Sequence, residues 1–200
     1  MSQIRYLAVA VALALLPLAA GIADAGMQAA GTTAAASEPT SLLSAVDYNF
    51  IAQANLGAPF QIDSGRLAES MALSSNLRDY AHLMVVSHIP VVNALNTILQ
   101  HKGITAPSEP LLHGAYDAIL ASLKAEHGAA FDRDYVNGQV EYQKGNAALF
   151  RNEIQNGSDP DLKQFARQTL PKIEDHLQRA LKLAQDGKHA GSASKPHKPS

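Results

Sequence analysis

Three polar side chains stand where the surrounding sequence otherwise places the apolar residues of a helix. His88 lies in the middle of the apolar stripe of residues 76–101, and Gln143 interrupts a similar stripe later in the chain. His176 lies on or beside a third stripe. A titratable ring at a core position must be hydrogen-bonded, paired or bound to a metal. These positions therefore predict either a buried polar layer or a metal site.

Helical periodicity predicts the elements that hold these side chains. Runs with apolar residues three and four positions apart are separated by short breaks, and no alternating strand pattern is present. Pro59, Pro90 and Pro171 lie inside three of the runs and predict kinks. The first run is expected to be kinked or split near Gly57. We expect an all-α domain at residues 41–185, folded as an antiparallel four-helix bundle with kinked helices. The predicted helices span residues 42–72, 76–101, 130–154 and 159–185, with a shorter helix at 111–123.

The two ends of the chain differ in composition from this domain. Arg5 precedes an apolar run at residues 6–20, and small residues then occupy the cleavage-determining positions, which predicts a cleaved signal peptide at residues 1–25. A retained membrane anchor is the alternative, but the run is shorter than the ~20 residues that a spanning helix needs. Residues 26–40 are expected to be a flexible linker, and residues 186–200 a disordered basic tail.

Composition excludes several classes of function. The 200-residue chain has no cysteine, so disulfides, thiolate catalysis, iron–sulfur clusters and covalently attached haem are excluded. Its formal net charge is −2, and the domain has no dense basic block of the kind that nucleic-acid binders carry. We expect a periplasmic protein whose mature chain has no transmembrane segment.

Short motifs follow one another in order across residues 46–183. They are Phe50 with Ala54, Gly65-Arg66-Leu67-Ala68, Met84 with His88, Gly103-Ile104, Phe131-Asp132 with Tyr135-Val136, Gln139-Val140, Asp159-Pro160 with Leu162, and Thr169-Leu170-Pro171 with His176-Leu177. Together they resemble a family of secreted bacterial domains of unknown function, family 4142, often labelled an outer-membrane protein. The resemblance implies a ferritin-like four-helix bundle.

This chain departs from the family pattern at the inward polar positions. The pattern usually carries Glu at the position of Gln61, Asp-His at Ser87-His88, and His at the positions of Gln143 and His176. Two of the four inward polar positions here therefore keep an imidazole, and the other two carry a neutral amide.

These departures weigh against a ferritin-like metal centre. A di-iron site of that type uses a Glu from each of two helices and a Glu-x-x-His motif from the other two. Val85 and Ile173 stand three residues before the two histidines, so neither motif is present. Nothing offsets the charge of a divalent ion. We expect no metal or cofactor, with His88 and His176 as weak candidates for Zn, Cu or Ni. The expected arrangement is a buried polar layer in which Gln61, His88, Gln143 and His176 hydrogen-bond one another.

The function expected from these features is non-catalytic. A compact exported domain without a cofactor suits an accessory or scaffolding subunit that binds a larger envelope protein. One concrete form, by analogy of kind, is the small cofactor-free subunit of a membrane-bound quinoprotein dehydrogenase such as alcohol dehydrogenase. The alternative is a ferritin-like metal-binding or oxidative- or envelope-stress protein with a degenerate metal site. Asp63 and Glu69 are the nearest carboxylates that could re-enter such a site.

Overall fold

A computed structural model describes the backbone of residues 43–193 and the side chains of residues 43–187. The described part of the chain is all-helical, as predicted. The predicted signal peptide (1–25) and linker (26–40) lie outside the described residues, as do residues 194–200 of the predicted tail. The helices are α1 (Ala45–Met71), α2 (Ser75–Lys102), α3 (Pro110–Ala125), α4 (Gly128–Asn156) and α5 (Pro160–Ala193).

Local sequence explains where the helices begin and end. Ser44 and Asp47 form a capping box at the start of α1, each side chain satisfying a backbone N–H of the other. Ser74 caps α2 through its hydroxyl, which accepts from the N–H of Leu77 at 3.4 Å. Gly103 ends α2 with a left-handed φ of 64°, a conformation that glycine adopts without strain.

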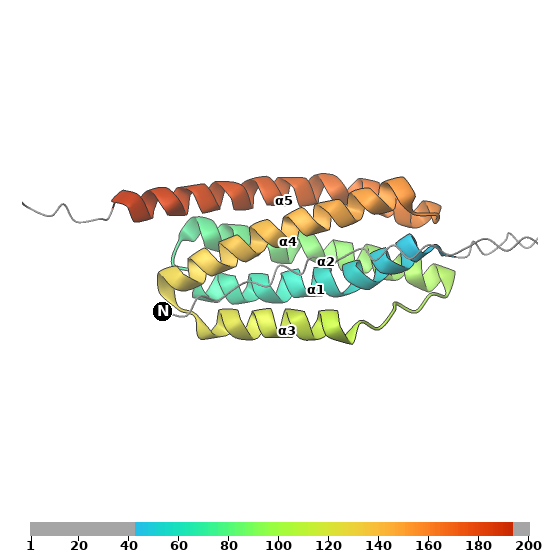
Figure 1. The fold of residues 1–200 in the computed structure, drawn as a ribbon, viewed down its shortest axis with the longest axis horizontal. Coiled ribbons are helices and arrows are strands. Elements are labelled where there is room, and N and C mark those ends of the chain that lie inside the picture. The colour runs from blue at the N-terminus through green and yellow to red at the C-terminus, as the bar shows by residue number, and fades with distance from the viewer. Residues whose placement is uncertain (1–42, 194–200) are drawn as a thin grey trace, which may run out of the picture. The chain divides into compact units, whose positions relative to one another are not determined.

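The four long helices form two hairpins. Short turns join α1 to α2 and α4 to α5, and the helices of each hairpin pack along each other (Figure 1). The hairpins meet through contacts of α1 with α4 and of α2 with α5, while α3 packs against α1 and α4. The sequence predicts a four-helix bundle with a shorter helix at residues 111–123, and the described residues form five helices, of which α3 is the shorter one. The shorter helix is separate because Gly128, with a φ of 62°, turns the chain before α4.

Two predicted helix boundaries differ from the structure. The sequence predicts a first helix that is kinked or split near Gly57, and the split is wrong, because α1 is one continuous helix that includes Pro59. At Gly57 the hydroxyl of Tyr142 occupies the space that a β-carbon would need. Packing of Tyr142 from α4 against Gly57 stabilises α1 where Gly57 and Pro59 would otherwise weaken the helix. At the other end, α5 continues past Gln185 to Ala193, so residues 186–193 of the predicted tail are helical.

Buried apolar side chains form two clusters along the four long helices. The Phe50 cluster includes a T-shaped contact between the rings of Phe50 and Phe150, whose centroids lie 4.9 Å apart. The Tyr135 cluster lies nearer the turn between α1 and α2. The Phe50 cluster contains Phe50, Ile51, Ala54, Leu95, Leu99, Ala147, Phe150, Leu162, Phe165, Ala166 and Ile173. The Tyr135 cluster contains Ala68, Ala72, Leu77, Tyr80, Ala81, Met84, Leu123, Phe131, Tyr135, Val136, Val140 and Ala180.

Candidate functional site

The stretch of core between the two apolar clusters is polar. Each long helix contributes one residue to it: Gln61 from α1, His88 from α2, Gln143 from α4 and His176 from α5. All four side chains are buried, with exposed fractions of 0 to 4%. All four residues that the sequence placed in a polar layer are thus buried, and the structure brings His88 and His176 into contact.

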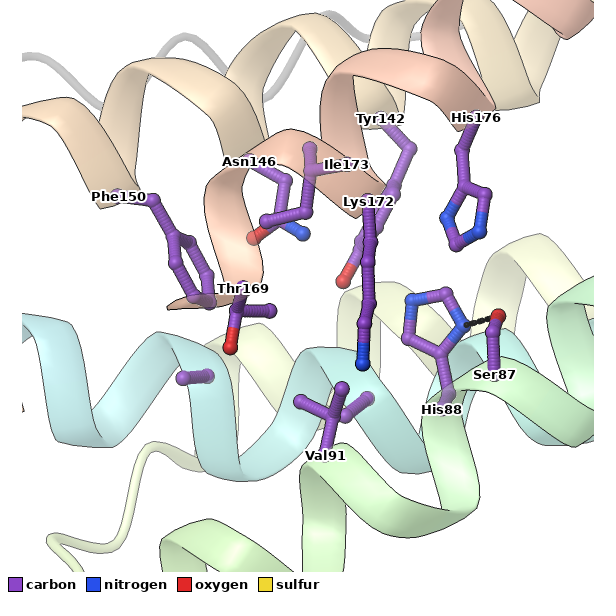
Figure 2. A pocket seen from close by; sticks show the side chains of 12 residues that line it. Ser87, His88, Val91, Tyr142, Asn146, Phe150, Thr169, Lys172, Ile173 and His176 are labelled. Atoms are coloured by element: carbon purple, nitrogen blue, oxygen red, sulfur yellow. Dashed lines mark hydrogen bonds between the residues drawn. The ribbon is translucent and has the colours of Figure 1, made fainter. Parts of the chain in front are cut away.

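The two histidines face each other across this layer. Their ring centroids are 5.4 Å apart with an angle of 36° between the planes, and Figure 2 shows the rings reaching toward one another from α2 and α5. The Nδ1 atom of His88 lies 2.8 Å from the carbonyl oxygen of Met84 and 3.4 Å from the hydroxyl of Ser87. A carbonyl only accepts, so Nδ1 of His88 carries the proton and its Nε2 keeps a lone pair.

Burial keeps both imidazoles neutral. Loss of solvation lowers the pKa of His88, partly opposed by its hydrogen bond to Met84. Burial, together with the neighbouring His88, lowers the pKa of His176 from 6.5 to about 4. A folded-state pKa below the unfolded value means that the unfolded chain takes up the proton first. Folding stability is therefore lost as the pH falls below about 6.5.

The hydrogen bonds in this layer differ from those predicted. None of the four predicted side chains bonds to another of them. The amide nitrogen of Gln143 donates instead to the sulfur of Met84 at 3.5 Å and to Gln139, one turn away on its own helix, at 3.4 Å. Several buried atoms have no hydrogen-bond partner: both amide atoms of Gln61, Oε1 of Gln143 and Nδ1 of His176. Such groups are rare in protein interiors, and each marks a place where a small ligand or water would be stabilised.

A small cavity adjoins the histidine pair (Figure 2). Its volume is about 20 Å³, enough for one water-sized guest and too small for an organic substrate. Asn146, Thr169 and Tyr142 contribute polar atoms to its wall. Lys172 also lines the cavity, although this residue is exposed to solvent. The nearby hydroxyl of Ser87 donates to the carbonyl of Leu83 at 2.6 Å, so this serine is held as part of the helix.

The carboxylates that could have completed a ferritin-like site point elsewhere. Asp63 is exposed, and its Oδ1 atom lies 3.7 Å from Nη1 of Arg66. Glu69 lies 2.6 Å from Nδ1 of His82 at the surface. No group of three or more His, Asp or Glu side chains within the described residues is arranged to hold a metal ion.

A second buried polar cluster was not anticipated from the sequence. It lies where the start of α1 meets the turn between α4 and α5, and its centre is Asp47. The carboxylate of Asp47 accepts hydrogen bonds from the N–H groups of Ser44 at 2.6 Å and Ser158 at 2.9 Å, and from both serine hydroxyls. Burial alone would raise the pKa of Asp47, but these bonds lower it below its ordinary value.

Glu153 lies in the same cluster and has no hydrogen-bond partner at either carboxyl oxygen, although its side chain is fully buried. Burial, followed by the proximity of Asp47, raises the pKa of Glu153 from 4.5 to about 8. The side chain is therefore protonated at neutral pH. Its position three residues after Phe150, beside the apolar stripe of α4, was the signal available in the sequence.

The outward side of α2 is uncharged over most of its length and exposes two large apolar side chains beside polar ones such as Asn93 and Thr97. No Asp, Glu, Lys or Arg occurs between Tyr80 and His101. Val86 and Ile89 are 46% and 42% exposed, although both are large and apolar. By length and composition α2 is long and apolar enough to cross a membrane, a test that core helices of soluble proteins also pass. Here its inward side is buried among the other helices.

Comparison with known proteins agrees with the fold and supplies a family. A crystal structure of a DUF305 fragment from Deinococcus radiodurans is similar, with a TM-score of 0.64 and 12% sequence identity, covering 72% of this chain and 98% of that chain. At this identity the likeness concerns the fold alone. No curated protein matches the chain. The family described as "Domain of unknown function (DUF4142)" matches residues 31–183, which confirms the resemblance seen in the sequence. Because this match spans most of the chain, the protein belongs to the DUF4142 family.

Proposed function

We propose that this chain is a non-catalytic, exported protein of the cell envelope that works by binding a larger protein in the periplasm or at the membrane surface. The observation that carries the proposal is the exposed, charge-free side of α2. We call it the α2 face and define it by Val86, Ile89 and Pro90. All three are exposed in the described structure.

The chemistry of the α2 face suits a protein interface. Exposed apolar patches commonly mark interaction sites, and the centres of protein interfaces are depleted of charged residues. The matching surface of the partner should also be apolar and uncharged, because a charged group buried against Val86 or Ile89 would find no counter-ion. One specific form of the proposal is a subunit of a membrane-bound quinoprotein dehydrogenase such as alcohol dehydrogenase.

The interior chemistry is consistent with a non-catalytic role. The cavity beside the histidine pair admits no organic substrate at about 20 Å³. The hydroxyl of Ser87 donates to a backbone carbonyl and lies 3.4 Å from the protonated Nδ1 of His88. A serine nucleophile needs an unprotonated base nitrogen within hydrogen-bond reach, which this arrangement does not provide.

Copurification from the native envelope tests the proposal. The chain would be purified in mild detergent as wild type, as Val86→Glu/Ile89→Glu, and as Leu111→Glu, and stoichiometric partners would be identified by mass spectrometry. Leu111 is the matched control, because it is a 91% exposed leucine on α3. We expect a larger partner to copurify with the wild type and the control and to be lost from the double variant. A partner retained equally by all three chains, or no partner at all, would refute docking through the α2 face.

A second candidate function rests on the histidine pair. We propose that the four long helices form an antiparallel four-helix bundle of the ferritin-like type, with α3 added at its side. In such bundles, metal ligands project from each helix into the middle of the core. The layer of Gln61, His88, Gln143 and His176 occupies that position, with two of its four side chains still able to bind metal. This supports a ferritin-like metal-binding or stress protein with a degenerate site.

A further inference from the structure

The hydrogen bond of His88 prepares its ring for a ligand. Histidines that bind metals almost always donate their second ring N–H to a carbonyl or carboxylate, which fixes the tautomer and the ring orientation. The Nδ1 atom of His88 makes such a bond to the carbonyl of Met84 at 2.8 Å. This leaves the Nε2 lone pair of His88 unprotonated beside the cavity.

His176 supplies a second nitrogen without a partner. Its side chain is 4% exposed, and its buried Nδ1 makes no hydrogen bond. Both rings line the same cavity of about 20 Å³, where one small ligand fits. His88 and His176 are thus two neutral imidazoles, from different helices, that line one small cavity.

The separation of the rings matches a shared metal ion. With metal–nitrogen bonds of 2.0–2.1 Å, each ring centre lies about 3.2 Å from the ion. Two such rings at tetrahedral to trigonal angles have centres about 5.2–5.5 Å apart. The observed separation between His88 and His176 is 5.4 Å.

The charges around the cavity select the kind of ion. No carboxylate lines the cavity, and Lys172 adds a positive charge at its side. Asp175, next to His176, lies 2.7 Å from Arg179 in an exposed ion pair. A doubly charged ion would therefore bring two uncompensated charges into this site, whereas a singly charged ion brings one. Imidazole is a ligand for both copper and zinc, so the donor atoms admit either metal, and Cu(I) carries the smaller charge.

We propose that His88 and His176 together bind one late transition-metal ion, with Cu(I) bound more tightly than Zn(II). The site uses Nε2 of His88 and Nδ1 of His176, and the cavity has room for a third ligand such as water. This inference rests on the second candidate function and is independent of docking through the α2 face. A failed metal titration would leave the copurification result untouched, and the reverse also holds.

Anaerobic titration of the purified full chain tests the proposal. Cu(I) would be delivered against a chromophoric chelator and Zn(II) measured separately, for wild type, His88→Gln, His176→Gln and His113→Gln. His113 is the matched control, because it is an exposed histidine on α3. We expect one Cu(I) per chain for wild type and control, and binding at least about tenfold weaker in both site variants. Lys172→Gln should bind more tightly, because it removes a positive charge. Absence of one-to-one binding, equal affinity in all chains, or tighter binding of Zn(II) would overturn the proposal.

A measurement on the wild type covers the case in which a site variant fails to fold. The chain would be labelled with ¹⁵N at histidine and its imidazole nitrogens followed by NMR as Cu(I) is added. We expect the signals of His88 Nε2 and His176 Nδ1 to shift together and to saturate at one equivalent. Shifts confined to other histidines, such as His189 and His197 near the C-terminus, would show adventitious binding and refute the site.

Discussion

Glu153 is a buried acid held in its neutral form. In the unfolded chain its carboxyl ionises near 4.5, while burial and the neighbouring Asp47 raise its folded-state pKa to about 8. The folded protein therefore keeps a proton that the unfolded chain has lost. By linkage, the contribution of Glu153 to folding stability is fully present below about pH 4.5. This contribution is lost as the pH rises toward 8.

Replacing this carboxyl with an amide should stabilise the protein above acid pH. We expect Glu153→Gln to raise the free energy of unfolding by roughly 1–3 kcal/mol at pH 7, because the amide has a similar shape and cannot ionise. Urea unfolding at about pH 5, 7 and 9 would measure the effect. Glu141→Gln, at an exposed position on the same helix, is the control and should change little. Identical pH profiles for Glu153→Gln and wild type would contradict the assignment of a neutral Glu153.

Residue positions could be read from the sequence more reliably than residue partners. The phases of His88, Gln143 and His176 against their apolar neighbours placed them inward, and all three are buried. Their hydrogen bonds depend on how far each helix slides and rotates against the next, which the period of one helix does not contain. Gln143 consequently bonds to Met84 and Gln139 and to none of the predicted residues.

At the scale of elements, the contact between α1 and α2 depends on a glycine. A β-carbon at Gly65 would lie 2.9 Å from the carbonyl oxygen of Ala81 and 2.9 Å from a methyl group of Val85. The first of these atoms belongs to the backbone of α2 and cannot move alone. The two helices approach this closely because Gly65 has no side chain.

Alanine at this position should push the two helices apart. We expect Gly65→Ala to destabilise the protein by about 1–3 kcal/mol, since overpacking outweighs the gain in helix propensity. Gly145→Ala is the matched control, because a β-carbon at this helical position meets no atom within 4 Å. That variant should stabilise the protein by about 0.5–1 kcal/mol. Thermal unfolding of both variants would measure these changes, and shifts in the same direction would argue against the close packing.

The three internal prolines show that tertiary packing can override the helix preference of the local sequence. Pro59, Pro90 and Pro171 each lie inside a continuous helix. An internal proline costs about 3 kcal/mol in an isolated helix. Around Pro59 this cost is offset by packing contacts of its neighbours, including the stacked rings of Phe60 and Tyr116, whose centroids lie 4.4 Å apart. A helix boundary inferred from proline alone is therefore weak where neighbouring helices cover the segment.

At the scale of the whole molecule, both apolar clusters draw on all four long helices. Lys102 forms two ion pairs at one end of the domain. Its Nζ atom lies 2.9 Å from Oδ2 of Asp159 and 2.7 Å from Oδ2 of Asp161. These ion pairs connect the end of α2 to the start of α5. These apolar clusters and ion pairs all lie within residues 43–193.

A chain limited to residues 43–193 should therefore fold by itself. We expect its helical circular dichroism to persist and its melting temperature to stay within about 3 °C of that of the longer protein. A chain ending at residue 156 is the control and should lose cooperative unfolding, because removing α5 takes Phe165 and Ile173 from the Phe50 cluster. A large drop in the melting temperature of the 43–193 chain would show that other residues contribute to the core.

The helical class, the family, the approximate helix boundaries and the inward placement of His88, Gln143 and His176 follow from the sequence alone. These follow from local quantities: apolar period, capping residues, glycines and the order of short motifs. The packing of α3 against α1 and α4, the 5.4 Å approach of His88 and His176, and the exposure of the α2 face became visible in the folded structure alone. It also brought Asp47 and Glu153 together from the first and fourth helices. Each of these depends on the relative placement of helices distant in sequence, which is fixed by side-chain packing between them and leaves no periodic trace in any one of them.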